Sequence, residues 1–236
     1  MNRLTRHLKT HLPRYGGEFL IIFLSITLTW WVDDLRQDLE DRRQEKRHLT
    51  NLMKNLETDS LNIIREMEGM ENSRKGLNDL YTRLDRSGTN PVDSLERYII
   101  PLIVVPEFHP AKSEYEALKS SGRLTLIQDD DLSENLMELY EVTYGQLDFM
   151  INITTITFQQ HSWDHTIRNF DLTGVLGPKR GGTTTRLFNP SERALLLNKI
   201  VLCSMAVRTT IPRFEACLQQ VKKIRKLTRA RISQLD

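Results

Sequence analysis

Apolar residues recur along the middle of the chain with the spacing of one long helix. Between residues 49 and 84, steps of four and three residues alternate, and nine of the eleven positions they mark are apolar. A repeat of 3.5 residues is typical of a helix that packs along a seam. We therefore predict a long helix over residues 33–84, which Gly88 can end in the left-handed conformation. Gly69 and Gly76 lie inside it and should each weaken it by about 1 kcal/mol relative to alanine. The seam positions are Leu49, Met53, Leu56, Ser60, Ile63, Met67, Met70, Arg74, Leu77, Tyr81 and Leu84.

Short helices are predicted between residues 91 and 122. Asn90 and Pro91 favour a helix start, with the asparagine as the cap and the proline in the first turn. Ser113 is expected to cap a second short helix, which Gly122 ends. The apolar stretch 124–127 is then expected to be extended.

A second long helix is predicted over residues 130–170. The aspartates 129–131 precede it, and negative charge is favourable at a helix N-terminus. The residues from Ile151 to Thr157 are mostly β-branched, which disfavours a helix locally. We expect packing against the rest of the protein to override this preference.

The last long helix is predicted over residues 190–235. Asn189 and Glu192 have the spacing of a capping box at its start, whereas Pro212 should kink or split it. Three long helices and several short ones predict an all-α fold, a long antiparallel bundle with coiled-coil-like packing. The helix that carries the 49–84 seam would pack against the other two long helices.

One uncharged run, Phe19–Val32, predicts an N-terminal transmembrane helix over residues 16–32. Fourteen residues are short for a hydrocarbon core of about 30 Å, but the 18 residues from Tyr15 reach about 27 Å. Tyr15 at one end and Trp30–Trp31 at the other match the aromatic belts of a membrane. Glu18 lies near the end of the span, where it can reach lipid headgroups. The alternative is a helix buried in a soluble core.

The charges around this run predict its orientation. The tail 1–15 carries four basic residues and no acid, which favours a cytoplasmic location. No small-x-small cleavage site follows the run, so we expect an uncleaved signal anchor. Residues 33–236 would then form one extracytoplasmic helical domain.

The composition argues against nucleic-acid binding and against sites built from cysteines. The net charge is +2 and the tail alone supplies +4, so the remainder is close to neutral and does not resemble a nucleic-acid binder. Cys203 and Cys217 are too few for a disulfide framework or a cysteine zinc site. We expect buried thiols, with an intermolecular bridge as the alternative.

Two histidines have the spacing of metal ligands. His161 and His165 lie four residues apart, and Asp164 could support them. Ser162 stands where the His-Glu-x-x-His pattern needs a glutamate, and His109 is a third ligand by residue type only. We therefore predict no metal site and expect partly exposed helix residues, with Trp163 packing inward.

The glycine-rich segment within residues 171–188 superficially resembles a phosphate loop. Thr183 occupies the position where a phosphate loop needs lysine, and no apolar strand precedes the segment. No serine or cysteine has the setting of a nucleophile elbow. We assign no catalytic, cofactor-binding or metal-binding residue and no cofactor, and we predict a non-enzymatic protein.

The C-terminal segment 222–231 is strongly basic. If the last helix runs back toward the membrane, this segment would lie beside the acidic residues 33–41 or against anionic lipid. A solvated basic face is the simpler alternative. The six cations are Lys222, Lys223, Arg225, Lys226, Arg229 and Arg231.

Two stretches resemble a family of uncharacterised bacterial membrane proteins with one N-terminal span and a helical domain. The first is Gly17-Glu18 followed by the apolar run, tryptophan and acids. The second is residues 115–122, Tyr-Glu-Ala-Leu-Lys-Ser-Ser-Gly, with Leu124, the pair 126–127 and Leu132 after it. The resemblance implies the bacterial inner membrane and a single pass; it implies no activity and no catalytic residue.

These observations predict a membrane-anchored helical scaffold or interaction protein. Its expected partners are the lipid bilayer, an unidentified protein, and a second copy that pairs through residues 49–84. The alternative is a single-pass sensor or regulatory subunit that relays a signal through the helix next to the membrane.

Overall fold

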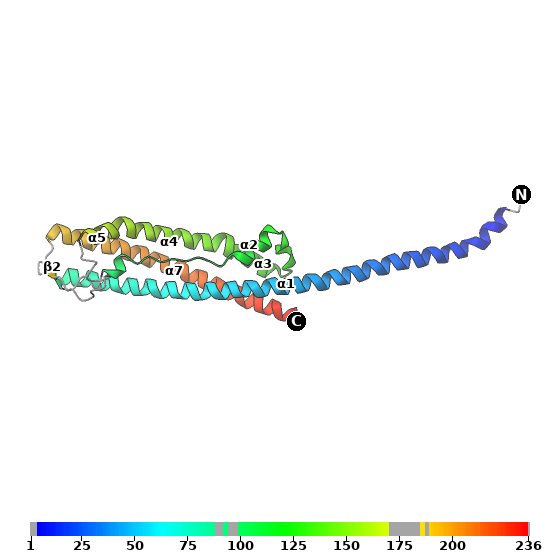
Figure 1. The fold of residues 1–236 in the computed structure, drawn as a ribbon, viewed down its shortest axis with the longest axis horizontal. Coiled ribbons are helices and arrows are strands. Elements are labelled where there is room, and N and C mark those ends of the chain that lie inside the picture. The colour runs from blue at the N-terminus through cyan, green and yellow to red at the C-terminus, as the bar shows by residue number, and fades with distance from the viewer. Residues whose placement is uncertain (1–3, 88–91, 94–98, 170–184, 187–188, 236) are drawn as a thin grey trace.

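The computed structural model describes residues 4–87, 92–93, 99–169, 185–186 and 189–235. Its helices form an elongated bundle from which one helix projects far beyond the others (Figure 1). The all-α prediction is confirmed. The predicted short helix that opens at Asn90–Pro91 and the glycine-rich segment fall largely outside the described residues.

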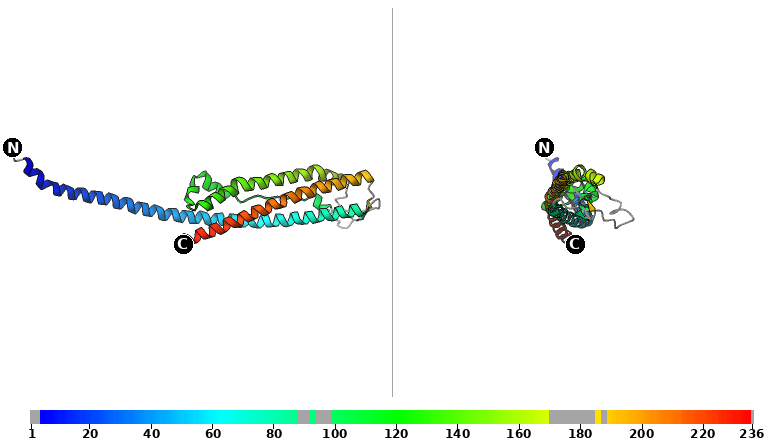
Figure 2. Two further views of the ribbon diagram at one scale, coloured as in Figure 1. Left: turned by 180° about the vertical axis from the view of Figure 1, so that it is seen from behind. Right: turned by 90° about the vertical axis from the view of Figure 1, so that its left-hand side faces the viewer.

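Helix α1 (Leu4–Ser87) is 84 residues long, which corresponds to about 126 Å. It contains both the predicted span and the predicted long helix without a break. In Figure 2 the C-terminal half of α1 lies along the bundle, and the N-terminal half extends away from it. Residues 33–47, which separate the two predicted segments, contain no glycine or proline and are mostly leucine, arginine, glutamine, glutamate and lysine, so nothing in them interrupts the helix.

A chain of short elements follows α1. A two-residue strand β1 (Val92–Asp93) pairs antiparallel with β2 (Thr185–Arg186). The helix predicted to start at Asn90–Pro91 is therefore wrong at positions 92–93, which are extended. The 3-10 helix η2 (Ile100–Leu102) then leads into a segment without regular structure.

Helix α2 (Ser113–Ser120) begins one residue earlier than predicted. Lys112 is its N-cap residue and makes no side-chain capping bond, so the cap assigned to Ser113 is wrong. The helix ends before Gly122 as predicted, and Gly122 has a φ of +69°, which is the left-handed conformation. Residues 123–126 form the 3-10 helix η3 (Arg123–Leu126), not the expected extended stretch; of the predicted stretch, only Ile127 is extended.

Five elements then run on in one line over residues 130–169. They are α3 (Asp130–Met137), the π-helix η4 (Glu138–Thr143), α4 (Tyr144–Phe158), the π-helix η5 (Gln159–Trp163) and α5 (Asp164–Asn169). The Asp129 carboxylate caps this rod by accepting from the Leu132 backbone N–H at 2.9 Å, as predicted. The β-branched stretch lies inside α4, where burial of Ile151 and Thr154 supports the predicted override.

Helix α7 (Pro190–Gln234) returns along the whole bundle. The predicted capping box is present, with Asn189 accepting from the Glu192 backbone and Glu192 accepting in return. Pro212 lies inside one uninterrupted helix, so it does not split α7. It sits on an exposed position, where its ring meets solvent and not a neighbouring helix.

The core lies between α1, α7 and the 130–169 rod, which the end-on view of Figure 2 shows gathered around one axis. Seven of the eleven predicted seam positions of α1 are buried, Met53 and Met67 are half-buried, and Arg74 and Tyr81 are exposed. The prediction that this seam packs against the last long helix is confirmed by the extensive α1–α7 contact. The buried seam residues are Leu49, Leu56, Ser60, Ile63, Met70, Leu77 and Leu84.

Gly76 allows a close approach that a larger residue would block. A β-carbon built on it would lie 2.3 Å from Cγ of Pro101, whereas one on Gly69 would meet nothing within 4 Å. The two glycines therefore differ: Gly76 lets η2 pack directly against α1, and Gly69 occupies open surface.

Candidate functional site

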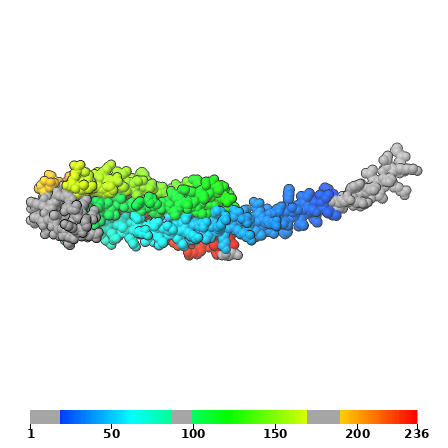
Figure 3. All heavy atoms as spheres, in the orientation of Figure 1, coloured from blue at the N-terminus to red at the C-terminus, as the bar shows by residue number. Residues whose placement is uncertain are grey.

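The part of α1 that projects from the bundle carries a continuous run of exposed apolar side chains. We call residues 19–40 the stalk; every one of them is exposed. Within the run from Phe19 to Val32, the apolar side chains expose between 41 % (Val32) and 75 % (Trp30) of their surface. A contiguous surface of this kind is unfavourable in water, at roughly 25 cal/mol per Å². Figure 3 shows the stalk projecting from the bundle, with no other part of the described chain covering the face in view.

The hydroxyl groups in this run are all satisfied inside the helix. Ser25 donates to the carbonyl of Ile21 at 2.7 Å, Thr27 to the carbonyl of Phe23 at 2.8 Å, and Thr29 to that of Ser25 at 2.8 Å. A lipid environment offers no partner to polar groups, so internal satisfaction is the condition for crossing it. The run therefore meets the hydrogen-bonding requirement of a membrane helix despite its three hydroxyl residues.

By length and apolar composition, one described helix is suited to cross a membrane, and it is α7, not the predicted segment 16–32. A third of its most apolar window is buried (33 %), and its inward residues Leu196, Ile200 and Val207 belong to the core. The N-terminal run is shorter and is closely followed by Asp33 and Asp34. Crossing a membrane with α7 would expose the core side chains that it shares with α1 and α4.

The end of the bundle nearest the stalk is closed by a buried ion pair. Glu45 is 1 % exposed, and Arg231 of α7 donates to both of its carboxylate oxygens. The Arg231 Nε lies 2.8 Å from Oε1, and Nη2 lies 2.9 Å from Oε2. The backbone N–H of Gln128 donates to the same carboxylate at 3.3 Å. This bidentate geometry is the strongest that an arginine makes with a carboxylate, and it raises the pKa of Arg231.

Helix α7 runs back along α1 as predicted, but its basic segment 222–231 contacts acids of α1 other than the predicted residues 33–41. Arg231 pairs with Glu45 and Arg225 with Glu57, the latter at 3.1 Å, and neither contacts the acidic residues 33–41. The local repeat could not predict these pairs, because each joins side chains more than 160 positions apart. The pairs fix the register of α7 against α1.

Geometry also disfavours contact between the basic segment and a membrane surface. Glu45 lies 13 residues beyond Val32, which is about 20 Å along a helix. The Debye length at physiological salt is about 8 Å. A membrane surface near Val32 would therefore be screened from Lys222, Lys226 and Arg229, which are exposed on α7.

A polar network lies inside the core, centred on Asp59. This residue is fully buried, and its carboxylate accepts from the Tyr144 hydroxyl at 2.5 Å and from the Ala111 backbone N–H at 2.8 Å. Burial raises the pKa of Asp59 and that of the Tyr144 phenol. Sequence reasoning missed this site; the signal was Ser60, a polar residue inside an apolar seam and directly after an aspartate.

Aromatic rings surround this network at the π-helix η4. Tyr140 stacks on Tyr115 with ring centroids 4.3 Å apart and meets Tyr144 edge-on at 5.3 Å. Tyr115 donates to Glu141 at 2.9 Å, and Lys119 pairs with the same carboxylate at 2.6 Å. These contacts tie α2 to the 130–169 rod, so the network has a structural explanation and contains no reactive pair open to solvent.

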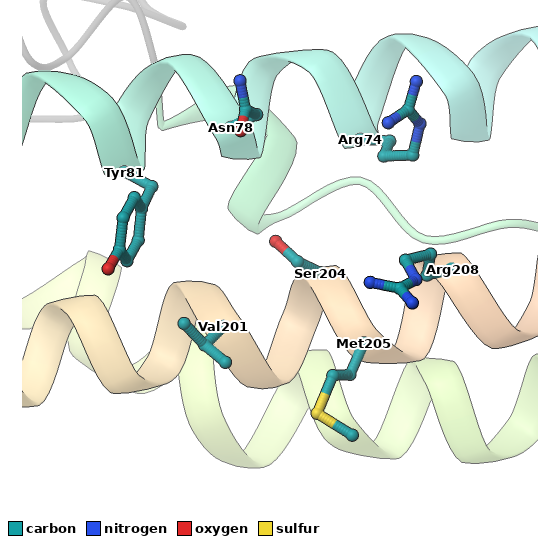
Figure 4. Close-up of a pocket in the computed structure, with 7 residues that line it drawn as sticks. All are labelled: Arg74, Asn78, Tyr81, Val201, Ser204, Met205 and Arg208. Atoms are coloured by element: carbon teal, nitrogen blue, oxygen red, sulfur yellow. The ribbon is translucent and has the colours of Figure 1, made fainter.

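A cleft of about 330 Å³ opens between α1 and α7 at the far end of the bundle (Figure 4). Tyr81 extends from α1 toward α7, while Ser204 and Arg208 of α7 face the space between the helices. Arg74 also lines the cleft and is paired with Glu71 at 2.5 Å. The complete lining is Arg74, Asn78, Tyr81, Val201, Ser204, Met205 and Arg208.

The cleft combines cationic and apolar groups. Arg208 has no hydrogen-bond or ion-pair partner among the described residues, whereas Val201 and Met205 form an apolar wall and expose 44 % and 59 % of their surface. A volume of this size lies at the lower end of small-ligand sites. The cleft can accept a small molecule with one anionic group and an apolar body.

The two histidines considered as metal ligands lie in neighbouring elements, His161 in the π-helix η5 and His165 in α5. His161 and His165 are both half-buried, and Trp163 packs against the core as predicted. Ser162, between them, donates to the carbonyls of Leu102 and Phe158 and is buried. The described residues contain no group of three or more potential metal ligands. His109 is exposed and bonded to Glu107, so it does not join the pair.

Both cysteines are buried free thiols, as predicted. Burial raises the pKa of Cys203 to about 11 and that of Cys217 to about 12. Both thiols are therefore protonated near neutral pH and poor nucleophiles.

No family model, curated protein or solved structure matches this chain. The resemblance to bacterial single-span membrane proteins therefore stays a prediction.

Proposed function

We propose that this protein is a membrane-anchored helical scaffold, in which residues 16–32 of α1 cross the bacterial inner membrane once. The tail 1–15 lies in the cytoplasm and the bundle on the opposite side. The observation that carries this proposal is the stalk: an exposed apolar run, with its hydroxyls satisfied internally, on the same helix that forms the core of the bundle. Lipid is the surrounding that such a run fits.

The bundle supplies the scaffold part of the proposal. Its described side chains form one continuous hydrophobic core and no evident catalytic centre. On the outer face of the 130–169 rod, four apolar residues of η4 and α4 stay exposed at helical spacing: Val142, Phe149, Ile153 and Ile156, with exposures of 40 to 63 %. Such a face supports contact with a protein partner.

Membrane fractionation tests the anchor. Replacing Phe23 and Ile26 by aspartate places two charges in the middle of the run, and each is expected to oppose insertion by about 2.5–3.5 kcal/mol. The variant should leave the membrane fraction and appear in the soluble or aggregated fraction. Unchanged membrane retention of this variant after alkaline washing would contradict the proposal.

A matched control lies on the same helix. Leu61 and Ile64 have the same spacing of three residues and are exposed, at 65 % and 37 %, but they lie within the bundle. Replacing both by aspartate should leave the protein in the membrane fraction. The comparison separates loss of the anchor from a general effect of two added charges.

The cleft supports a second candidate function, a membrane sensor. Both of its walls are long helices, and α1 continues from Tyr81 to the stalk without a break. A ligand that draws Arg208 toward α1 would alter the packing of that helix. The chemistry of the lining fits an anionic amphiphile such as a fatty carboxylate.

Calorimetric titration of the full-length protein in detergent with laurate tests this second function. Arg208→Ala should weaken laurate binding, dodecanol should bind more weakly than laurate, and Arg213→Ala, outside the cleft on the same helix, should have no effect. Equal binding of laurate and dodecanol would exclude an anion site here.

A further inference from the structure

The seam of α1 continues past the bundle into the stalk. Counting back from Leu49 in the same alternating steps gives positions 46, 42, 39, 35 and 32. Three of these are apolar, and all three are exposed: Val32 at 41 %, Leu35 at 48 % and Leu39 at 50 %. One helix therefore carries a single repeat that α7 covers in the bundle and that nothing in the described chain covers in the stalk.

The chain's own elements do not reach this part of the seam. Helix α7 ends at Gln234, and Arg231 in its last turn is held at Glu45. Residues 19–40 are exposed throughout, and the ribbon views show α1 alone in this region (Figures 1 and 2). A covering partner must come from another molecule.

We infer that the occupant is a second copy of this chain, whose stalk pairs in parallel with the first through Val32, Leu35 and Leu39. This inference rests on the proposed membrane anchor, because two chains inserted with the same orientation can pair only in parallel. Confinement of both chains to one membrane raises their effective concentration, so a short seam suffices.

The charges beside the seam fit this parallel arrangement. In a parallel pair, the residue before one seam position faces the residue five positions later on the partner helix. Asp38 precedes Leu39, and five positions later is Arg43, so each chain offers an acid to a base of the other. Both side chains are exposed and free to pair across the interface.

The sequence also limits the paired seam at the end nearest the bundle. Arg42 and Lys46 occupy the next two seam positions, and two like charges facing each other oppose pairing there. Pairing would thus stop where α7 begins to cover α1, so the two bundles would not contact each other through this seam. The buried members of the 49–84 seam are occupied by the chain's own core, which moves the predicted self-association from residues 49–84 to the stalk.

Lipid is a poorer occupant of this surface. Asp33, Asp34, Asp38 and Glu40 surround the apolar residues of the stalk beyond Val32, and all four are exposed. An anionic membrane surface repels such a segment. A second copy satisfies both the apolar seam and the charges that flank it.

Cysteine crosslinking of the full-length protein in its membrane tests the pairing. Leu35→Cys and Leu39→Cys place thiols on the seam, and Gln37→Cys places one on the outward face of the same helix. The seam thiols should form an intermolecular disulfide about tenfold faster than the outward thiol, because only they approach within the roughly 7 Å that a disulfide spans between α-carbons. The native thiols are buried and should contribute little background.

Equal rates at the three positions, or no crosslink at any of them in membrane-inserted protein, would overturn the pairing and leave the anchor standing. Recovery of the unmodified protein in the soluble fraction would overturn both. Fractionation of each sample before crosslinking therefore separates the two failures.

Charge exchange gives an independent readout of the parallel register. Asp38→Arg and Arg43→Asp should each lower crosslinking through Leu39→Cys, and the two together should restore it. Glu40→Arg, an equally exposed acid away from the seam, should change it little. Failure of the double exchange to restore crosslinking would reject the register.

Discussion

The two halves of α1 carry the same repeat of apolar positions but differ in burial. In the bundle, Leu49, Leu56 and Leu77 are fully buried, whereas Leu35 and Leu39 in the stalk are about half exposed. The repeat therefore specifies which face of a helix is apolar and does not specify what covers it. Burial is decided by the position of α7, which the Glu45–Arg231 pair fixes at the end of the bundle.

The largest expected difference between the halves concerns their leucines. Leu56→Ala removes a fully buried side chain and should lower the free energy of unfolding by about 2–5 kcal/mol, because it leaves a cavity. Leu39→Ala removes a half-exposed one and should change it by at most about 0.5 kcal/mol. Denaturant unfolding in detergent, followed by circular dichroism, measures both. Equal losses would mean that the stalk is as well packed as the bundle.

The buried polar network should give the next largest effect. Tyr144→Phe removes the hydroxyl that donates to Asp59 and leaves a buried carboxylate with one donor fewer. We expect a loss of about 1–3 kcal/mol in the free energy of unfolding. Tyr81→Phe removes a hydroxyl from an exposed ring and serves as the control, with no loss expected. A Tyr144→Phe variant as stable as the parent would show that the network is not stabilising.

The two helix glycines sharpen the comparison, because their substitutions should have opposite signs. Gly69→Ala meets open space and should stabilise the protein by up to about 1 kcal/mol through helix propensity. Gly76→Ala places a methyl group against the Pro101 ring and should destabilise it by about 1–3 kcal/mol. Thermal unfolding midpoints of the two variants test this; a shift in the same direction for both would contradict the close packing of η2 on α1.

The smallest expected effect is a change in how the free energy of unfolding depends on pH. Burial raises the pKa of Asp59, so the folded protein binds this proton more readily than the unfolded chain. The resulting stabilisation is fully present below the unfolded-state pKa and is lost as pH rises through the folded-state pKa. Asp59→Asn has no such proton, so the difference in free energy of unfolding between parent and variant should vary with pH across this acidic range. A constant difference would show that Asp59 does not titrate with folding.

Local patterns in the sequence predicted much of the fold. The capping box at Asn189, the cap at Asp129 and the helix stop at Gly122 depend on neighbouring residues, and the structure contains all three. The predictions of a cap at Ser113 and of an extended stretch over residues 124–126 were wrong because short segments between helices follow tertiary packing. The N-terminal position of the membrane span stays a prediction.

The site was less predictable than the fold. Asp59 meets Tyr144 across 85 positions and Glu45 meets Arg231 across 186, and no periodicity encodes such distances. The cleft likewise depends on which faces of α1 and α7 meet. Arg74 and Tyr81 held seam positions in the predicted repeat, yet they line this opening, because a straight helix drifts relative to a 3.5-residue repeat.

Because α1 is one unbroken helix, the distance of the bundle from Val32 and its rotation about the helix axis change together. Each residue inserted into the segment between Val32 and Glu45 would lift the bundle by about 1.5 Å and turn it by about 100° around the helix axis. Seven added residues would raise it by about 10 Å and return it nearly to its starting direction, whereas two would turn it to the opposite side. Natural changes of length in this segment should therefore favour multiples of seven if the direction in which the bundle faces matters to the cell.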